Sequence, residues 1–321
     1  MSERIEWLAL SAVPGVGPSV FRALLKRFGG PREAMEAPMG ELAAVPRVTP
    51  EMAEAIRAAP ETIDRLAEEI AGLSEEDIDF LTWDDDRYPE RLRGIPQSPP
   101  ILWVRGALLS EDERAVAVVG SRACTEEGFR LARQMACALA EAGVTVVSGV
   151  AEGIDTAAHG GALEGRGRTL GVLGSGVRVI SPRSNWELAE RIVDFGALLS
   201  EQHPNTPPST GALWSRDRIV SGLSRAVVLV EGAADSGSLD TCRRARKQGR
   251  GLFAVDWGRH DERRSANAEV LAWATALSPD GDIDPVLAFL DRPEAESEAA
   301  PAEQTLTLDL DDADVGESTA R

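Results

Sequence analysis

The chain has 321 residues, of which 43% are apolar, and a net charge of −19. Such an acidic balance argues against a general polyanion binder, because phosphate contacts require lysine and arginine. The cysteines, Cys124, Cys137 and Cys242, follow neither a metal-ligand nor a disulfide spacing, so we expect a reducing compartment and no metal. No apolar run approaches the roughly 18 residues of a membrane span, and the N-terminus lacks a signal-peptide pattern. These features predict a soluble cytoplasmic protein of about two domains, with no membrane partner.

Residues 1–72 are predicted to form a small helical domain. Apolar side chains recur at helical spacing, as at Val20, Leu24 and Phe28, and glycine and proline pairs separate the segments. The phrase AVPGVGPSVFRALLKRFGG resembles a helix-hairpin-helix (SAM-like) element, whose Gly-Val-Gly turn exposes backbone N–H groups that can contact a phosphate. A bundle used only for packing or protein contact is the alternative.

Residues 73–113 are predicted to form a connector that packs on the following domain. Its four prolines argue against a continuous helix. The aromatic side chains of Trp83, Tyr88 and Trp103, with the apolar run 101–104, indicate burial against a neighbouring surface.

Residues 114–290 alternate apolar, β-rich runs with segments of helical spacing. Runs that are apolar on both faces are typical of a parallel sheet covered by helices on both sides. We therefore predict an α/β domain of the Rossmann-like, doubly wound class. The expected strands are Ala115–Val119, Val144–Val147, Thr169–Leu173, Ala197–Leu199, Ala226–Val230 and Gly251–Val255. The expected helices are Phe129–Ala142, Thr156–Leu163, Trp186–Val193, Leu239–Gln248 and Ala268–Leu277.

Residues 291–321 are predicted to form a disordered acidic tail. They contain ten acids against Arg292 and Arg321, a net charge of −8, and few apolar residues to bury. The remaining body carries −11 of the −19 charges. Any nucleic-acid site must therefore be a local basic pocket in an acidic surface.

Glycines and serines follow the predicted strands, where ligands bind in open α/β sheets. Glycine allows close backbone approach, and helix-start N–H groups attract anions. Arg122 is the best candidate to pair with a phosphate, and an ion pair with Asp155 or Glu201 is its structural alternative. The predicted phosphate- or DNA-binding residues are Gly120, Ser121, Arg122, Ser148, Gly149, Gly153, Gly174, Ser175, Gly176, Arg216, Arg218, Ser236, Gly237 and Ser238.

No catalytic residue is predicted. Asp155 and His159 lie four residues apart at a helix start and share a face, so an acid/base pair is one interpretation. We favour a structural role, with Asp155 accepting backbone N–H bonds and His159 bonded to a neighbouring loop. Glu201 is likewise expected to be structural at the site, and no cofactor is predicted.

The motifs in this order resemble the DNA-processing protein A (DprA/Smf) family, over about Leu81 to Leu290. The segments that carry the resemblance are WDDDRYPERLRGIPQSPPILWVRG, AVVGSRACTEEGFRLA, VVSGVAEGIDTAAHGGAL, LGVLGSGV, LLSEQHP, SRDRIVSGLSRAVVLVEG and DSGSLDTCRRARKQGRGLFAV. The N-terminal region also looks like the small helical domain that precedes the Rossmann-like domain in many members.

The resemblance implies a protein that binds and protects incoming single-stranded DNA and helps to load RecA in transformation and recombination, without catalytic turnover. Members usually form homodimers through the Rossmann-like domain. The resemblance places Gly120, Ser121 and Arg122 in the family's GSR loop, which lines its DNA pocket. Trp214 and Trp257 are candidates for stacking on bases.

The sequence departs from the family pattern in three acidic positions. Glu152 replaces an arginine of the usual SGLARGID, Asp217 an asparagine of RNRI, and Asp240 an apolar residue after SGSL. All three are expected near the pocket, where the added negative charge either weakens DNA binding or marks a divergent member with another ligand.

The alternative function is a Rossmann-like nucleotide-binding sensor, or a phosphoribohydrolase-like enzyme, in phage defence. Such hydrolases share a PGGxGTxxE loop with a catalytic glutamate. The comparable loop here is DSGSLDTCRR, which lacks the paired glycines and has Arg244 where the glutamate is expected. These differences argue against the hydrolase more than against a sensor.

Overall fold

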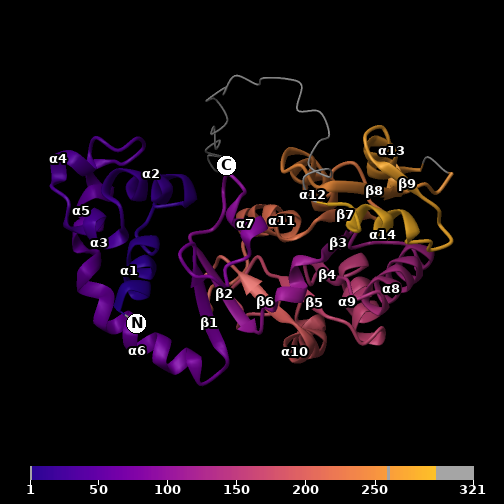
Figure 1. Ribbon diagram of the computed structural model, residues 1–321, viewed down its shortest axis with the longest axis horizontal. Helices are drawn as coiled ribbons and strands as arrows, with labels where there is room; N and C mark the ends of the chain where they lie inside the picture. The colour runs from indigo at the N-terminus through magenta and orange to yellow at the C-terminus, as the bar shows by residue number, and fades with distance from the viewer. Residues whose placement is uncertain (1, 259–260, 294–321) are drawn as a thin grey trace, which may run out of the picture.

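The computed structural model describes residues 2–258 and 261–293. An N-terminal group of helices lies beside an α/β body, as Figure 1 shows in indigo and in magenta to yellow. The N-terminal elements are α1 (Ser2–Ser11), α2 (Pro18–Phe28), α3 (Pro31–Glu36), α4 (Met39–Leu42), α5 (Pro50–Ala58), η1 (Ala59–Thr62) and α6 (Ile63–Ser74).

Local signals set the boundaries of these helices. Pro18 and Pro50 occupy the first positions of α2 and α5, where a missing N–H costs nothing. Thr49 caps α5 by accepting a hydrogen bond from the backbone N–H of Met52. Gly29 ends α2 with φ 95°, a conformation that favours glycine. The glycine and proline punctuation of the sequence therefore acts as predicted.

The body is built on one nine-stranded sheet in the order β1-β2-β6-β5-β4-β3-β7-β8-β9. The seven strands from β6 to β9 in that order are mutually parallel, and β1 and β2 pair antiparallel at one edge. The strands are β1 (Ile78–Thr82), β2 (Ile101–Gly106), β3 (Ala115–Val119), β4 (Thr145–Ser148), β5 (Thr169–Val172), β6 (Ala197–Ser200), β7 (Ala226–Leu229), β8 (Gly251–Val255) and β9 (Thr275–Leu277). The predicted Rossmann-like fold class is confirmed.

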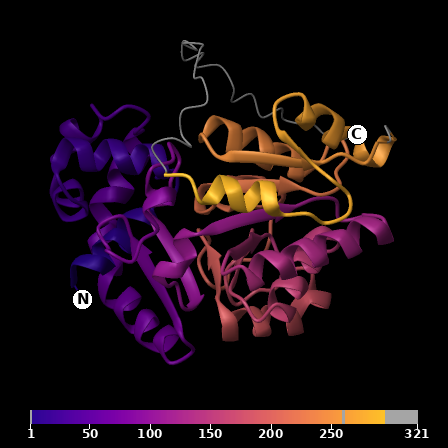
Figure 2. The ribbon, with the colours of Figure 1, turned by 45° about the vertical axis from the view of Figure 1, so that its right-hand side comes forward.

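Helices cover both faces of the sheet (Figure 2). Along β3, Ala115, Ala117 and Val119 pack towards α11, α12 and α13, whereas Val116 and Val118 pack towards α8, α9 and α14. These helices are α8 (Glu126–Glu141), α9 (Ile154–Glu164), α10 (Trp186–Phe195), α11 (Thr210–Leu223), α12 (Gly237–Lys247), α13 (Ser265–Leu271) and α14 (Asp284–Leu290). The remaining short helices are α7 (Glu90–Arg93), η2 (Ser110–Glu113), η3 (Arg183–Asn185) and η4 (Glu262–Arg264).

One sequence-based expectation was wrong in detail, and the connector contains strands that the sequence analysis did not predict. Its β1 and β2 extend the sheet through β6. Residues 268–277 are not one helix, because α13 ends at Leu271 and Thr275–Leu277 pairs with β8 as strand β9. Helical and strand periods cannot be distinguished in so short an apolar run.

The chain reverses direction across the sheet at β3. From β3, the strands β4, β5 and β6 are added on one side, and β7, β8 and β9 follow on the other. Such a reversal opens a crevice at the carboxyl ends of the central strands.

Asp291, the first residue of the predicted tail, forms an ion pair with Arg114 at 2.8 Å. The disorder predicted for residues 294–321 lies outside the described residues.

Aromatic packing joins the N-terminal helices to the sheet edge. The rings of Trp7, Phe21 and Trp83 contact one another with centroids 5.2 to 5.9 Å apart. Trp83 follows β1, and its indole N–H donates to Ser98. His203, which follows β6, also lies 2.9 Å from Glu69 of α6. Within the described ranges no helix is both long and apolar enough to cross a membrane.

Candidate nucleic-acid interface at the sheet edge

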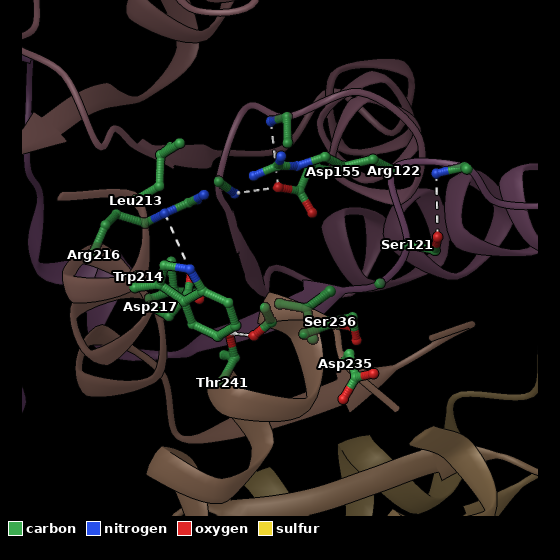
Figure 3. Close-up of a pocket in the computed structure, with 18 of the residues that line it drawn as sticks. Ser121, Arg122, Asp155, Leu213, Trp214, Arg216, Asp217, Asp235, Ser236 and Thr241 are labelled. Atoms are coloured by element: carbon green, nitrogen blue, oxygen red, sulfur yellow. Dashed lines mark hydrogen bonds and ion pairs between the residues drawn. The ribbon is translucent and has the colours of Figure 1, made fainter. Parts of the chain in front are cut away.

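A cavity of about 440 Å³ lies at the carboxyl ends of the central strands, and we call it the sheet-edge cavity (Figure 3). Its walls are the loop after β3, the loop after β4, the first turns of α11 and the loop that leads into α12. The residues that line it include Gly120, Ser121, Arg122, Gly149, Asp155, Leu213, Trp214, Arg216, Asp217, Asp235, Ser236, Gly237, Ser238 and Thr241.

The loop after β3 brings an exposed cation to the cavity. A Cβ at Gly120 would lie 2.5 Å from the side chain of Ile154, so only glycine fits there. Ser121 turns the loop by accepting the backbone N–H of Ala123 at its Oγ. Arg122 is exposed and, within residues 2–258 and 261–293, has no ion-pair partner. The predicted alternative, pairing with Asp155 or Glu201, is therefore absent from the described structure.

The loop after β4 is folded around the Asp155 carboxylate. Asp155 accepts hydrogen bonds from the backbone N–H groups of Gly149 at 3.2 Å and Ala151 at 3.3 Å. Burial raises the pKa of Asp155, while Arg216 acts in the opposite direction. Gly153 (φ 77°) does not line the cavity, and a Cβ there would lie 2.3 Å from the carbonyl oxygen of Ser121. Gly153 therefore allows the two loops to pack together.

Helix α11 adds a second arginine and an acid. Arg216 donates to the carbonyl of Val172 at 3.1 Å, and its guanidinium fills the space that a Cβ at Gly149 would take. Its Nε lies 3.3 Å from Asp217 Oδ1. Burial is the main cause that raises the pKa of Asp217 to about 7, and Asp155 adds to the effect. The net charge of this wall therefore changes near neutral pH.

The loop before α12 supplies hydroxyls and a helix start. Ser236 caps α12 by accepting from the backbone N–H of Leu239, and its Oγ lies 2.8 Å from that of Ser238. The N-terminus of this 11-residue helix faces the sheet-edge cavity through Gly237 and Ser238. Helix N-termini favour anions through their free N–H groups and dipole.

Trp214 and Leu213 form the apolar wall of the cavity. Trp214 is 44% exposed and lines the cavity, so its ring is accessible to a ligand there. The other stacking candidate, Trp257, is a core residue: its indole N–H donates to the carbonyl of Val230 at 2.8 Å, and Arg264 covers its ring.

Several predicted binding residues do not line the cavity. The Ser148 hydroxyl is buried and donates to the carbonyl of Val118. Gly176 packs under the loop that carries His203 and Pro204, and Gly174 packs against Leu213 of α11. The Ser175 hydroxyl donates to the carbonyl of Val179. Arg218 turns to the opposite side of α11. Sequence order put all these residues near strand ends, but only side-chain direction decides which of them face the crevice.

Arg218 and Glu201 form a buried clamp instead of a ligand site. The two Arg218 terminal nitrogens donate to the two Glu201 oxygens at 2.7 and 2.6 Å, and its Nε donates to the carbonyl of Gln97. This clamp ties α11 to β6 and to the segment before β2. Glu201 thus has a structural partner in Arg218.

The geometry does not favour acid/base chemistry at Asp155 and His159. The His159 ring is fully buried, and its Nδ1 lies 2.7 Å from the hydroxyl of Thr169 in β5, a strand and not a loop. Burial lowers the pKa of His159 to about 3, so the imidazole is neutral. No cluster of three or more His, Cys, Asp or Glu side chains with metal-binding geometry occurs in the described residues.

Only one of the three acidic departures lines the cavity. Asp217 is in its wall, whereas Glu152 is exposed and accepts from the hydroxyl of Ser184. Asp240 is paired with Arg244 one turn along α12. Asp235 and Thr241 also line the cavity and were not singled out from the sequence. Their position next to the Ser236–Ser238 motif is the signal that identifies them.

The fold and this site define a Rossmann-like α/β protein with a glycine- and serine-lined cavity at its topological switch point. The chain matches the DNA recombination-mediator protein A family over residues 79–284 and the DprA-like N-terminal HHH domain over residues 1–72. The chain belongs to the DNA recombination-mediator protein A family, as the resemblance predicted.

Individual proteins of known sequence or structure are similar to this chain and support its assignment to the family. Protein Smf of Synechocystis is 36% identical over 258 residues, covering 79% of this chain and 65% of that protein. The X-ray structure of DNA processing protein A (DprA) from Streptococcus pneumoniae superimposes with a TM-score of 0.74 at 30% identity, covering 90% of this chain and 98% of that one. A Helicobacter pylori structure, described by its single-stranded DNA binding mode, has a TM-score of 0.57 at 25% identity, covering 68% and 95%. The chain spans 60–65% of the length of curated relatives such as Smf.

Proposed function

We propose that this protein binds single-stranded DNA across the sheet-edge cavity, without catalytic turnover. The observation that carries the proposal is that Arg122 and Trp214, both exposed, line one glycine- and serine-lined cavity, and that Arg122 has no ion-pair partner among the residues that the structure describes. Cationic grooves with stacking aromatics are the common design of sequence-tolerant single-strand binders. The related Helicobacter pylori protein is described as a single-stranded DNA binder.

Each wall has a defined role in this proposal. Arg122 and the N–H groups at the start of α12 contact phosphates, and Trp214 stacks on a base. Arg216 stays in the wall, where it offsets the charge of Asp155 and Asp217. Because the cavity holds both cations and acids, binding is weak for one cavity and sensitive to salt.

Self-association compensates for a weak single cavity. We propose that the protein acts as a homodimer, since two cavities on one strand raise the apparent affinity through effective concentration. In this role it protects incoming DNA and assists RecA loading in transformation and recombination. Two measurements test this extension. The first is the rate of RecA filament assembly on an oligonucleotide with and without the protein, and the second is the molar mass of the protein in solution, which gives its oligomeric state. A monomer that neither protects the strand nor speeds assembly contradicts this extension.

The binding proposal is tested by fluorescence anisotropy of a labelled oligonucleotide over a salt series. Arg122→Ala is expected to weaken binding about tenfold or more and to reduce the salt slope by about 1, the contribution of one phosphate contact. Arg130→Ala is the matched control, because Arg130 is an exposed arginine of α8 that does not line the cavity. Equal losses in both variants would overturn the proposal.

A nucleotide-release assay separates this function from the nucleotide-binding alternative. The binding proposal expects no turnover of nucleotides by the wild-type protein. Turnover that Arg122→Ala abolishes would assign the cavity to a hydrolase. Saturable thermal stabilisation by a mononucleotide, without oligonucleotide binding, would assign it to a sensor.

A further inference from the structure

A second hollow of about 730 Å³ lies along α12, away from the sheet-edge cavity, and we call it the α12 groove. One wall is the exposed side of α12, and the other is the segment 95–97 before β2. Trp273, which follows α13, closes one side. The proposed DNA function makes no use of this groove.

The groove has an excess of positive charge in an acidic protein. Arg243 pairs with Glu269 at 2.8 Å, and Arg244 pairs with Asp240. The next two cations, Arg246 and Lys247, have no ion-pair partner in the part of the chain that the structure describes. The surplus therefore lies in the last turn of α12.

The groove also has an apolar wall. Ile95 and Pro96 line one side, and the Trp273 ring lies under the Arg246 guanidinium at 5.1 Å. A ligand that fits both walls carries acids on one side and aliphatic groups on the other. Mononucleotides and free phosphate lack the aliphatic side.

A segment of this chain beyond the described residues has that chemistry. Residues 304–314 read QTLTLDLDDAD. In an extended chain, Leu306, Leu308 and Leu310 fall on one face and Asp309 and Asp311 on the other. Asp312 and Asp314 add further charge. The segment therefore matches the cationic and apolar walls of the groove.

The described chain ends near the lysine end of the groove. Arg225 donates to the carbonyls of Leu290 at 2.6 Å and Arg292 at 3.0 Å. The Arg225 carbonyl in turn accepts the backbone N–H of Gly251, the first residue of β8, just after the Lys247 end of α12. Residues 294–303, which separate the described chain from this segment, span at most about 35 Å when extended.

We propose that residues 304–314 dock in the α12 groove of the same chain, with their acids on Arg246 and Lys247 and their leucines on Ile95, Pro96 and Trp273. Docking in this way makes the C-terminal segment an internal competitor for any other acidic partner of α12. The proposal does not depend on DNA binding at the sheet-edge cavity.

The composition of the chain offers a direct test. Lys26 and Lys247 are the only lysines, and both are exposed. A carbodiimide joins a lysine amine to a carboxylate in direct contact, so wild-type full-length protein is cross-linked and mapped by mass spectrometry. We expect links from Lys247 to Asp309, Asp311, Asp312 or Asp314, and at least fivefold fewer from Lys26 to these acids.

Charge reversal and isotope mixing complete the test. Arg246→Glu retains Lys247 and is expected to reduce its links at least threefold, whereas Arg130→Glu on α8 leaves them unchanged. A mixture of nitrogen-15 and unlabelled protein identifies links between chains. No links from Lys247 to residues 304–314, equal links from Lys26, or links only between chains would each overturn the proposal.

Discussion

Asp217 gives the wall of the sheet-edge cavity a charge that changes near neutral pH. Burial raises its pKa to about 7, and Asp155 and Asp240 act in the same direction against Arg216 and Arg244. Below that value the carboxyl is neutral and does not repel a phosphate. Single-strand affinity is therefore expected to fall as the pH rises from 6 to 8.

Asp217→Asn removes this titration. We expect the wild-type affinity to weaken severalfold from pH 6 to 8, and the variant affinity to change at most twofold, in anisotropy titrations at constant salt. Asp235→Asn is the control, because Asp235 is an exposed carboxylate of the same cavity. A pH dependence that Asp217→Asn leaves intact would assign the effect to another group.

The same substitution has a defined effect on stability. Because folding raises the pKa of Asp217 above its ordinary value of 3.8, the native state binds the extra proton between about pH 4 and 7. The wild-type stability contribution is thus full below pH 4 and is lost as the pH rises to about 7. Denaturant unfolding is expected to show Asp217→Asn gaining stability over wild type across this window. A constant difference between the two proteins from pH 4 to 8 would contradict it.

At the scale of elements, α11 presents two arginines to opposite sides. Arg216 faces the sheet-edge cavity, and Arg218 is clamped to Glu201. Arg218→Met leaves a largely buried carboxylate without its partner, which costs about 3 kcal/mol of unfolding free energy. The Arg218→Met protein that remains folded should still bind single-stranded DNA with wild-type affinity.

The Arg216→Met variant is expected to lose DNA affinity, unlike Arg218→Met. Arg216→Met removes the cation that offsets Asp155 and Asp217, so single-strand affinity is expected to fall at least fivefold. Urea unfolding and anisotropy on both variants check the pair. The double variant Arg218→Met, Glu201→Leu is the control and should recover part of the lost stability. If folded Arg218→Met protein lost affinity for single-stranded DNA, Arg218 would have to be assigned to the DNA-binding site after all.

At the scale of the whole molecule, Trp83 couples the N-terminal helices to the sheet. Its ring contacts Trp7 and Phe21, and the Arg22 guanidinium lies 4.7 Å from its centroid. Trp83→Ala opens a gap between the two bodies and costs about 3 kcal/mol. Hydrogen exchange is expected to speed up in α1 and α2 while β3, β4 and β7 keep their protection.

A matched substitution tests whether coupling or general damage is responsible. Trp273→Ala removes another partly buried tryptophan, which lines the α12 groove and follows α13. Helix α13 lies on the far side of the molecule from α1 (Figure 1). It should leave exchange in α1 and α2 unchanged. If hydrogen exchange in Trp83→Ala were uniformly faster across the sheet, Trp83 would stabilise the whole α/β body and not specifically the contact between the N-terminal helices and the sheet.

The sequence by itself determined the strand–helix alternation, the fold class and the family. Runs such as AVAVV in β3 are apolar on both faces, and the glycine–serine loops follow them at the ligand-binding end of the sheet. These signals are local, so they can be recognised in the sequence without knowledge of the fold. The same locality explains why β9 was missed, since its three residues are strand only because β8 lies beside them.

Only the tertiary structure decided which side chains share the sheet-edge cavity. Arg216 and Arg218 are two positions apart on α11, yet helical geometry directs one to the cavity and the other to Glu201. Glu152 and Asp217 are both acidic departures, but only burial beside Arg216 makes Asp217 part of the wall. Direction, burial and partner depend on contacts between residues far apart in the chain, and a linear pattern does not contain them.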